Sequence, residues 1–191
     1  MAQNVTEHPS NENQLNVVSV RLVKDAPIMS DKPITTPMDA VQLLGRELCE
    51  FDRECLVILC LKKNGVPICC TFNSLGSIDS SIAHPREMFK TAILSNAANM
   101  IIIHNHPSGT LTPSESDTAI TERMVNLCNL IQIPLLDHII VGGDNSQYFS
   151  FKEKDILPYP KGRTCTDYNE IEFQQLEVAE NPVQRSPRRH R

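Results

Sequence analysis

The sequence of 191 residues contains no tryptophan, and aromatic residues make up only 5% of it. Its apolar runs, such as 56–61 and 139–141, are far shorter than the roughly 20 residues that a membrane-spanning helix needs. The start of the chain, from Met1 to Gln14, has no basic segment followed by an apolar stretch, so no signal peptide is predicted. We therefore expect a soluble protein with no membrane contact.

An excess of positive charge is also missing. Lys and Arg number 18 against 23 Asp and Glu, which gives a net charge of −5. A dedicated nucleic-acid-binding protein is expected to be strongly basic, so nucleic acid stays open as a partner but the charge does not support it. No two of the seven cysteines form a C-x-x-C pair, and without an export signal this favours reduced thiols and a cytoplasmic location.

The composition divides the chain into three parts. Residues 1–16 are polar without apolar periodicity, which predicts a flexible N-terminal tail. Residues 17–160 alternate between strand and helix patterns and are predicted to form one domain. Residues 161–191 contain an acidic stretch followed by an arginine-rich end. This pattern predicts a flexible, solvated tail, or alternatively an arm that contacts a partner or a nucleic acid.

Short strands and helices alternate within the predicted domain. Asn64-Gly65 is a strong hairpin-turn signal, because both residue types tolerate a positive φ. Mixed strands with interleaved helices predict an α/β (α+β) fold with a mixed central sheet flanked by helices. The expected helices are 37–48, 85–97 and 113–130, and the expected strands are 17–23, 55–61, 68–72, 100–103, 137–141 and 147–151.

Two histidines follow the apolar strand predicted at 100–103. His104 and His106 are two residues apart, so their side chains point to the same side of the sheet. Such a pair can hold a metal ion, or it can be a pair of hydrogen-bonded core histidines. The spacing by itself leaves both readings open.

An acidic residue on the next helix favours the metal. A Thr112-x-x-Glu115 capping box, with Pro113 at the first helical position, predicts where this helix begins. Asp117 then lies three residues before Ile120 and belongs to the apolar face. A core-facing carboxylate is costly unless a positive group meets it. No Lys or Arg of this helix shares that face, whereas the two histidines are placed to point there.

Two imidazoles and one carboxylate are the usual ligands of a catalytic zinc, which keeps a fourth position for water. We predict one Zn²⁺ per chain, held by His104, His106 and Asp117. The metal would activate water for attack on a carbonyl, and an adjacent carboxylate would take the proton. Ser114, three residues before Asp117, is interpreted either as a donor to the developing oxyanion or as a helix cap.

The pattern His104-x-His106, seven residues, Ser114, two residues, Asp117 resembles the JAMM motif of the JAB/MPN metalloprotease superfamily. Three further stretches, at 85–87, 96–109 and 136–140, are similar to its bacterial RadC-like branch, and the similarity covers about 17–151. The resemblance implies a cytidine-deaminase-like fold, zinc bound by the two histidines and the aspartate, and cleavage of peptide or isopeptide bonds.

The resemblance also implies a glutamate as general base, and that role falls best on Glu54, just before the strand predicted at 55–61. Glu87 is the alternative, although its place in the first turn of a helix is explained by the helix dipole alone. His138 is interpreted as a hydrogen-bonded core residue, or else as a residue that contacts a metal ligand or the substrate.

These observations together predict a zinc-dependent metallohydrolase, a JAMM-type protease or isopeptidase, with Glu54 and Ser114 as catalytic residues and a peptide or protein as substrate. The alternative is a non-catalytic RadC-like interaction module, associated with DNA repair or with mobile elements. The complete residue set favours the hydrolase, because a scaffold has no physical reason to keep a core-facing aspartate beside two histidines.

Overall fold

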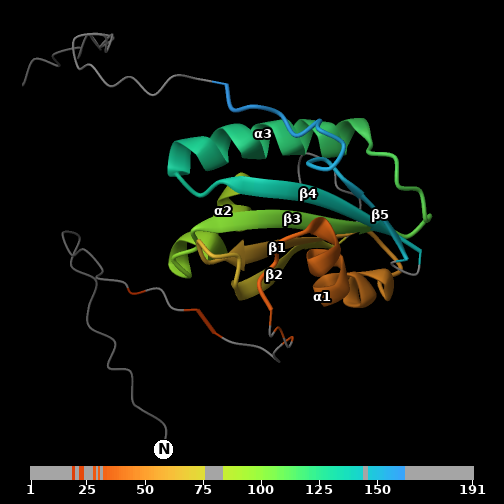
Figure 1. The fold of residues 1–191 in the computed structure, drawn as a ribbon, viewed down its shortest axis with the longest axis horizontal. Coiled ribbons are helices and arrows are strands. Elements are labelled where there is room, and N and C mark those ends of the chain that lie inside the picture. Colours follow the sequence, from red (N-terminus) through yellow and green to blue (C-terminus); the bar gives the residue numbers. More distant parts are fainter. Residues whose placement is uncertain are drawn as a thin grey trace, which may run out of the picture. The chain divides into compact units, whose positions relative to one another are not determined.

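The computed structural model describes residues 32–75, 84–143 and 146–161, together with five isolated positions between 19 and 30. The predicted strand at 17–23 lies mostly outside the described residues, and Ser19, Leu22 and Val23 are not in a strand. Both predicted tails, apart from Lys161, lie outside them as well. The described elements are α1 (Pro37–Cys49), β1 (Cys55–Leu61), β2 (Pro67–Leu75), α2 (Pro85–Leu94), β3 (Asn99–His106), α3 (Glu115–Ile131), β4 (Leu135–Gly142) and β5 (Gln147–Ser150) (Figure 1).

The strands of the described residues form one mixed sheet in the order β2-β1-β3-β4-β5. Strand β3 stands at its centre, antiparallel to β1 and parallel to β4. Residues Met100–His106 are buried along their whole length, which explains the uninterrupted apolar run before the histidines. The predicted mixed central sheet is therefore confirmed.

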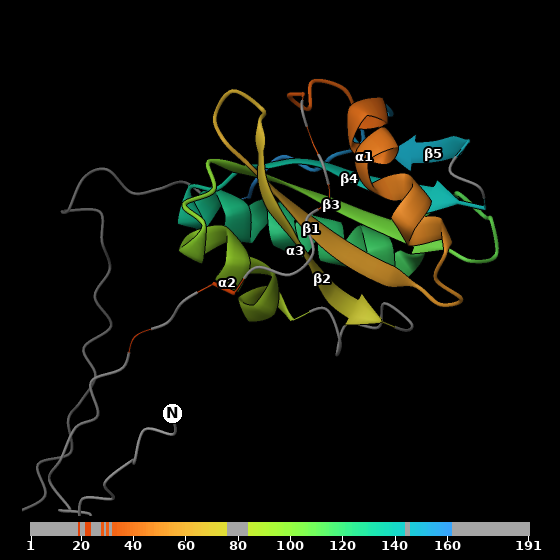
Figure 2. The ribbon, with the colours of Figure 1, turned by 90° about the horizontal axis from the view of Figure 1, so that it is seen from below.

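Helices cover both faces of the sheet, with α1 on one face and α2 and α3 on the other (Figure 2). The side chains of β3 alternate between the two layers. Met100 and Ile102 pack in the cluster that includes α2 and α3, whereas Ile101 and Ile103 pack in the cluster that includes α1. His104 and His106 continue the first series and so face α3, while Asn105 continues the second. No helix in the described part of the chain is both long enough and apolar enough to cross a membrane.

Helix α1 begins as the sequence predicts. Thr36 is the N-cap, Pro37 occupies the first turn, and Asp39 completes the capping box. The carboxylate of Asp39 accepts the backbone N–H groups of Thr35 and Thr36, at 2.8 and 2.7 Å. These bonds lower the pKa of Asp39 to about 2, because they favour the charged form.

The predicted start of α3 is wrong by two residues. The N-cap is Ser114 rather than Thr112, and its capping-box partner is Asp117 rather than Glu115. The sequence contains two overlapping boxes of the same type, and the later one satisfies a buried carboxylate with donors from its own helix start. Helix α2 ends at Leu94, earlier than predicted, because Asn96 takes a positive φ of 51°.

Two features of the predicted hairpin turn between β1 and β2 require a glycine at position 65. Its φ is +81°, in the region that residues with a Cβ rarely adopt. The segment before α1 also packs closely on the turn, because the N–H of Ile34 donates to the carbonyl of Gly65 at 2.9 Å. A Cβ at Gly65 would lie 2.7 Å from the carbonyl oxygen of Ile34.

We predict that Gly65→Ala lowers the free energy of unfolding by more than the left-handed penalty alone, which is about 1–2 kcal/mol. The matched control is Gly143→Ala, because Gly143 has a φ of +58° but, apart from its chain neighbours, no atom of the described residues lies within 4 Å of an added Cβ. Urea denaturation of both variants would measure the difference. Equal losses would show that the contact with Ile34 contributes nothing.

Candidate metal centre

The two histidines at the end of β3 and the first turn of α3 meet on one face of the sheet. His104 and His106 lie on the same side, as their spacing predicts, and their Nε2 atoms are 3.0 Å apart. Asp117 approaches both, with Oδ1 3.2 Å from Nε2 of His104 and Oδ2 3.5 Å from Nε2 of His106. Among the described residues, these three form the only group of His, Cys, Asp and Glu side chains spaced to hold a metal ion.

The hydrogen bonds of His106 determine which ring nitrogen carries the proton. Its Nδ1 lies 2.6 Å from the carbonyl oxygen of Thr110. A carbonyl only accepts, so Nδ1 of His106 is the donor. Its Nε2, in the neutral ring, therefore presents a lone pair toward His104 and Asp117.

A chain of three hydrogen bonds makes the same assignment for His104. The hydroxyl of Thr121 lies 2.5 Å from the carbonyl oxygen of Asp117 and donates to it. Nδ1 of His138 must then donate to the Thr121 oxygen at 2.6 Å, which leaves Nε2 of His138 as an acceptor. Nδ1 of His104, 2.8 Å from that Nε2, is the donor. Nε2 of His104 consequently carries a lone pair as well.

Burial favours the neutral form of the two imidazole rings in this series of hydrogen bonds. His104 and His138 have no exposed surface. Burial lowers the pKa of His104 and lowers that of His138 further, because the charged imidazolium is disfavoured in a dry interior. His138 thus occupies the hydrogen-bonded core position that the sequence suggested, and its direct partner is a proposed metal ligand.

Three lone-pair donors therefore converge at this point. In a tetrahedral site with bonds of about 2.0–2.1 Å, ligand atoms lie about 3.3–3.4 Å apart. The two Nε2 atoms are 3.0 Å apart and Oδ1 of Asp117 is 3.2 Å from Nε2 of His104, which is close to that spacing. The pKa of His106 is raised, chiefly by its hydrogen bond with Asp117, so a proton is the competitor of a metal for the same place. The set could hold a divalent metal ion with nitrogen and oxygen ligands.

The carboxylate of Asp117 is oriented by the start of its own helix. Its Oδ2 accepts the backbone N–H and the hydroxyl of Ser114, both at 2.7 Å. The Ser114 oxygen in turn accepts the backbone N–H of Asp117 at 3.1 Å. Ser114 is thus a helix cap that also directs Oδ1 of Asp117 toward His104. These contacts do not test the oxyanion role predicted for Ser114.

A glycine in β4 allows the loop after β3 to reach His106. Gly142 is the register partner of His106 in the parallel pair. A Cβ at Gly142 would lie 2.8 Å from the carbonyl oxygen of Gly109. Only a residue without a side chain permits this approach, which places the loop that carries the Thr110 carbonyl against His106.

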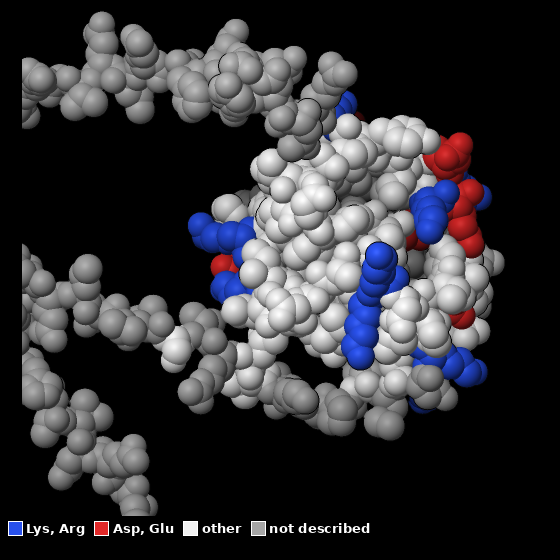
Figure 3. Space-filling view, turned by 60° about the vertical axis from the view of Figure 1, so that its left-hand side comes forward, with Lys and Arg blue, Asp and Glu red and all other residues white. Residues whose placement is uncertain are grey.

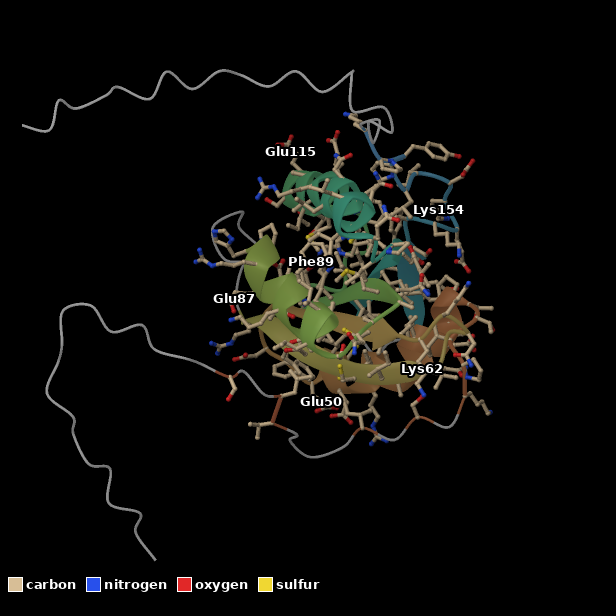
Figure 4. The ribbon with its side chains drawn as sticks, turned by 90° about the vertical axis from the view of Figure 1, so that its left-hand side faces the viewer. Glu50, Lys62, Glu87, Phe89, Glu115 and Lys154 are labelled. Carbon is tan, nitrogen blue, oxygen red and sulfur yellow. The ribbon has the colours of Figure 1, made fainter. Side chains whose placement is uncertain are left out.

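The two candidate bases lie in different surroundings. Glu54 is half-buried and precedes Leu56, the register partner of His104. The charge of Glu54 acts to raise the pKa of His104 and of His106, although burial and Asp117 have larger effects on both pKa values. Glu87 lies on the outer side of α2, where it pairs with Lys90 (Figure 4).

Asn105 is a residue to which the sequence analysis assigned no role. Its Oδ1 accepts the N–H of Cys55 at 2.7 Å, and its Nδ2 donates to the carbonyl of Arg53 at 3.1 Å. These two bonds enclose Glu54 from both sides along the chain. The available signal was its place between two histidines, which puts it on the opposite face of β3. Thr121 was missed too, although it lies one helical turn after Asp117.

A cleft of about 390 Å³ reaches the site at His106, the one proposed ligand that lines it. One wall is formed by residues 49–52, which connect α1 to β1, and the other by the end of β3 and Gly143. His106 lines it, and 10% of its side chain is exposed, whereas that of His104 is fully buried. The site is therefore open on the His106 side.

Comparison with known proteins identifies the family. The sequence profile described as RadC-like JAB domain matches residues 34–156. The chain is 42% identical over 130 residues to a UPF0758 protein of Clostridium beijerinckii, which covers 68% of this chain and 56% of that protein. It is 45% identical over 124 residues to a UPF0758 protein of Clostridium tetani, a match that covers 65% of this chain and 54% of that protein. It is 40% identical over 124 residues to one of Rubrobacter xylanophilus, which covers 65% of this chain and 53% of that protein. The chain spans about half the length of these curated relatives, and it belongs to the family of RadC-like JAB domains.

Proposed function

We propose that this domain is a zinc-dependent metallohydrolase of the JAMM type, which cleaves a peptide or isopeptide bond in a protein or peptide substrate. The observation that carries the proposal is the convergence of two imidazole lone pairs and one carboxylate at 3.0–3.5 Å, with His106 lining an open cleft. The donor set suits zinc, with His104, His106 and Asp117 as ligands. A zinc ion bound there would polarise the substrate carbonyl and lower the pKa of an attacking water.

The chain's own residues supply the proton transfers in this proposal. Glu54 is close enough to act electrostatically on both histidines, so its carboxylate would take the proton of the attacking water and pass it to the leaving amine. Asn105 would keep the segment around Glu54 in place through its bonds to Arg53 and Cys55. In this role Asn105 is a positioning residue.

Ser114 would assist the same reaction as a hydrogen-bond donor. Its hydroxyl is 2.7 Å from Oδ2 of Asp117. The other oxygen of the same carboxylate, Oδ1, faces His104. Rotation of this hydroxyl toward the cleft would let it donate to the oxyanion that develops on the substrate carbonyl. Asp117 would keep the backbone N–H of Ser114 as a partner during that rotation.

The non-catalytic alternative, with its association with DNA repair or mobile elements, is weighed by the same experiments. On the face shown in Figure 3, Lys and Arg side chains of the described residues stand singly or beside acidic ones. The described residues of this face therefore form no extended basic patch of the kind expected for a nucleic-acid partner (Figure 3). Failure of metal-loaded protein to cleave any amide in a broad panel of peptides and isopeptides would support the interaction module instead.

Asp117→Ala is predicted to reduce bound zinc from one ion per chain to a small fraction, measured by elemental analysis of protein purified without chelator. The matched control is Asp39→Ala, because each aspartate is the third helical residue (N3) and completes the capping box of its helix. Both variants should weaken the start of their helix, because each loses one half of its capping box. Only Asp117→Ala should lose metal, and with it the stability that a bound metal adds to the folded state. Equal metal contents in the two variants would contradict the proposed ligand set.

Glu54→Gln is predicted to keep the fold and the metal and to lose about 10²–10⁴-fold in hydrolysis, since an amide cannot accept the proton. Glu87→Gln should leave activity near the parent level, because Glu87 pairs with Lys90 on the outer side of α2. The assay is zinc-dependent cleavage of a peptide or isopeptide that the parent protein cleaves. Full activity of Glu54→Gln together with inactive Glu87→Gln would reverse the assignment of the base.

Asn105→Asp should separate positioning from metal binding. The change keeps the acceptor for the Cys55 N–H but sets a carboxylate oxygen against the carbonyl of Arg53, 3.1 Å from the present donor. We expect kcat to fall at least tenfold while KM and zinc content stay near the parent values, because only Glu54 is displaced. A proportional loss of zinc would show that Asn105 supports the ligands rather than the base.

A further inference from the structure

Sulfur atoms form a row across the sheet on the face covered by α2 and α3. Cys69 of β2 stands opposite Cys60 of β1, and Cys60 stands opposite Met100 of β3. The row ends in α3, where Sγ of Cys128 lies 3.3 Å from Sδ of Met100. Within this row, Cys60 and Cys69 are two thiols at directly opposed positions of neighbouring strands.

The backbone already satisfies the distance that a disulfide needs between these two residues. Directly opposed residues of an antiparallel pair have Cα atoms about 4.5 or 5.5 Å apart, and disulfides span about 4.4–6.8 Å. The side chains of Cys60 and Cys69 point to the same face, and their thiols form a hydrogen bond with each other. Cys70, by contrast, opposes Leu59 and packs on the α1 side.

We propose that Cys60 and Cys69 are a redox-active dithiol, which a low-molecular-weight disulfide of the glutathione type converts into a reversible cross-strand disulfide. Exposure assigns the order of attack. Cys69 is half-buried on the edge strand β2, whereas Cys60 is fully buried. Cys69 is therefore the thiol that the small oxidant reaches, and Cys60 is the one that resolves the intermediate.

Hydrogen bonding supports the same order. The bond from the Cys60 thiol lowers the pKa of Cys69 to about 6 and raises that of Cys60. Cys69 is therefore the more acidic of the two thiols, and the thiolate is the nucleophile in thiol–disulfide exchange.

The exchange balances in two steps. The thiolate of Cys69 attacks one sulfur of the oxidant, forms a mixed disulfide and releases one thiolate, which takes up a proton. Cys60 then gives up its proton, and its sulfur attacks Sγ of Cys69, which breaks the mixed disulfide and releases the second thiol. The two cysteines together lose two electrons and two protons, and the oxidant is reduced to two thiols.

This pair lies away from the proposed metal ligands along the same strands. Cys60 pairs with Met100 near the start of β3, whereas Leu56 pairs with His104 near its end. The dithiol proposal is thus independent of the proposed hydrolase function. Zinc content and disulfide formation can be measured separately on the same sample.

The test uses the full chain, kept folded in glutathione buffers of rising oxidised fraction, then quenched with an alkylating reagent and digested with trypsin. Cys60 falls in the tryptic peptide 54–62 together with Cys55, and Cys69 falls in 64–86 together with Cys70. We expect two of the seven thiols to be lost and recovered on reduction, with these two peptides linked. The double variant Cys55→Ser/Cys70→Ser should keep the link, because only Cys60 and Cys69 then remain in the two peptides.

Two single variants in that background complete the test. Cys60→Ser should stop at a mixed disulfide of glutathione on Cys69, and Cys69→Ser should abolish both the link and the adduct. Cys128→Ser is the matched control from the same sulfur row and should keep the link. The proposal is overturned if folded parent protein forms no link between the two peptides, or if the link forms only after unfolding in urea. The parent chain reports this outcome even where a variant fails to fold.

Discussion

The buried charge of Asp117 is the constraint around which the candidate site is arranged. Its carboxylate is 1% exposed and faces two lone-pair nitrogens instead of a basic side chain. Such a group is stable only if donors or a cation compensate for the lost hydration. Ser114 supplies two donors to one oxygen, and a metal ion would satisfy the other. The helix cap and the proposed metal site thus depend on the same carboxylate.

The central strand connects this site to the remaining structure through both of its faces. On one face, His104 continues through His138 and Thr121 back to the helix that carries Asp117, so the ring orientation of one proposed ligand depends on the helix of another. On the other face, Asn105 ties β3 to the segment before β1. Consecutive residues of β3 thus serve both faces, because strand side chains alternate in direction. His104 and His106 are proposed ligands on one face, and Asn105 positions the segment of the proposed base on the other.

The same alternation of strand side chains places two thiols on this face of the sheet, away from the proposed metal ligands. Cys60 and Cys69 face the layer of α2 and α3, as His104 does, but at the opposite end of the β1–β3 pairing. The nitrogen and oxygen ligands of the proposed metal site and the soft thiols of the proposed redox pair are thereby kept apart on one face. This separation matters, because thiolates compete strongly for zinc.

Local patterns in the sequence determined the features that depend on near neighbours. The start of α1 at Pro37, the Asn64-Gly65 turn, the central apolar strand and the shared side of His104 and His106 were all predictable, since each follows from a pattern within a short segment. The start of α3 was not, because two overlapping capping boxes are equivalent in sequence and only the buried environment of Asp117 distinguishes them. Tertiary structure alone decided that His138 and Thr121 orient His104, that Asn105 holds the segment around Glu54, and that Cys60 opposes Cys69. Those contacts join residues from different elements, and strand order and register, which no local pattern encodes, bring them together.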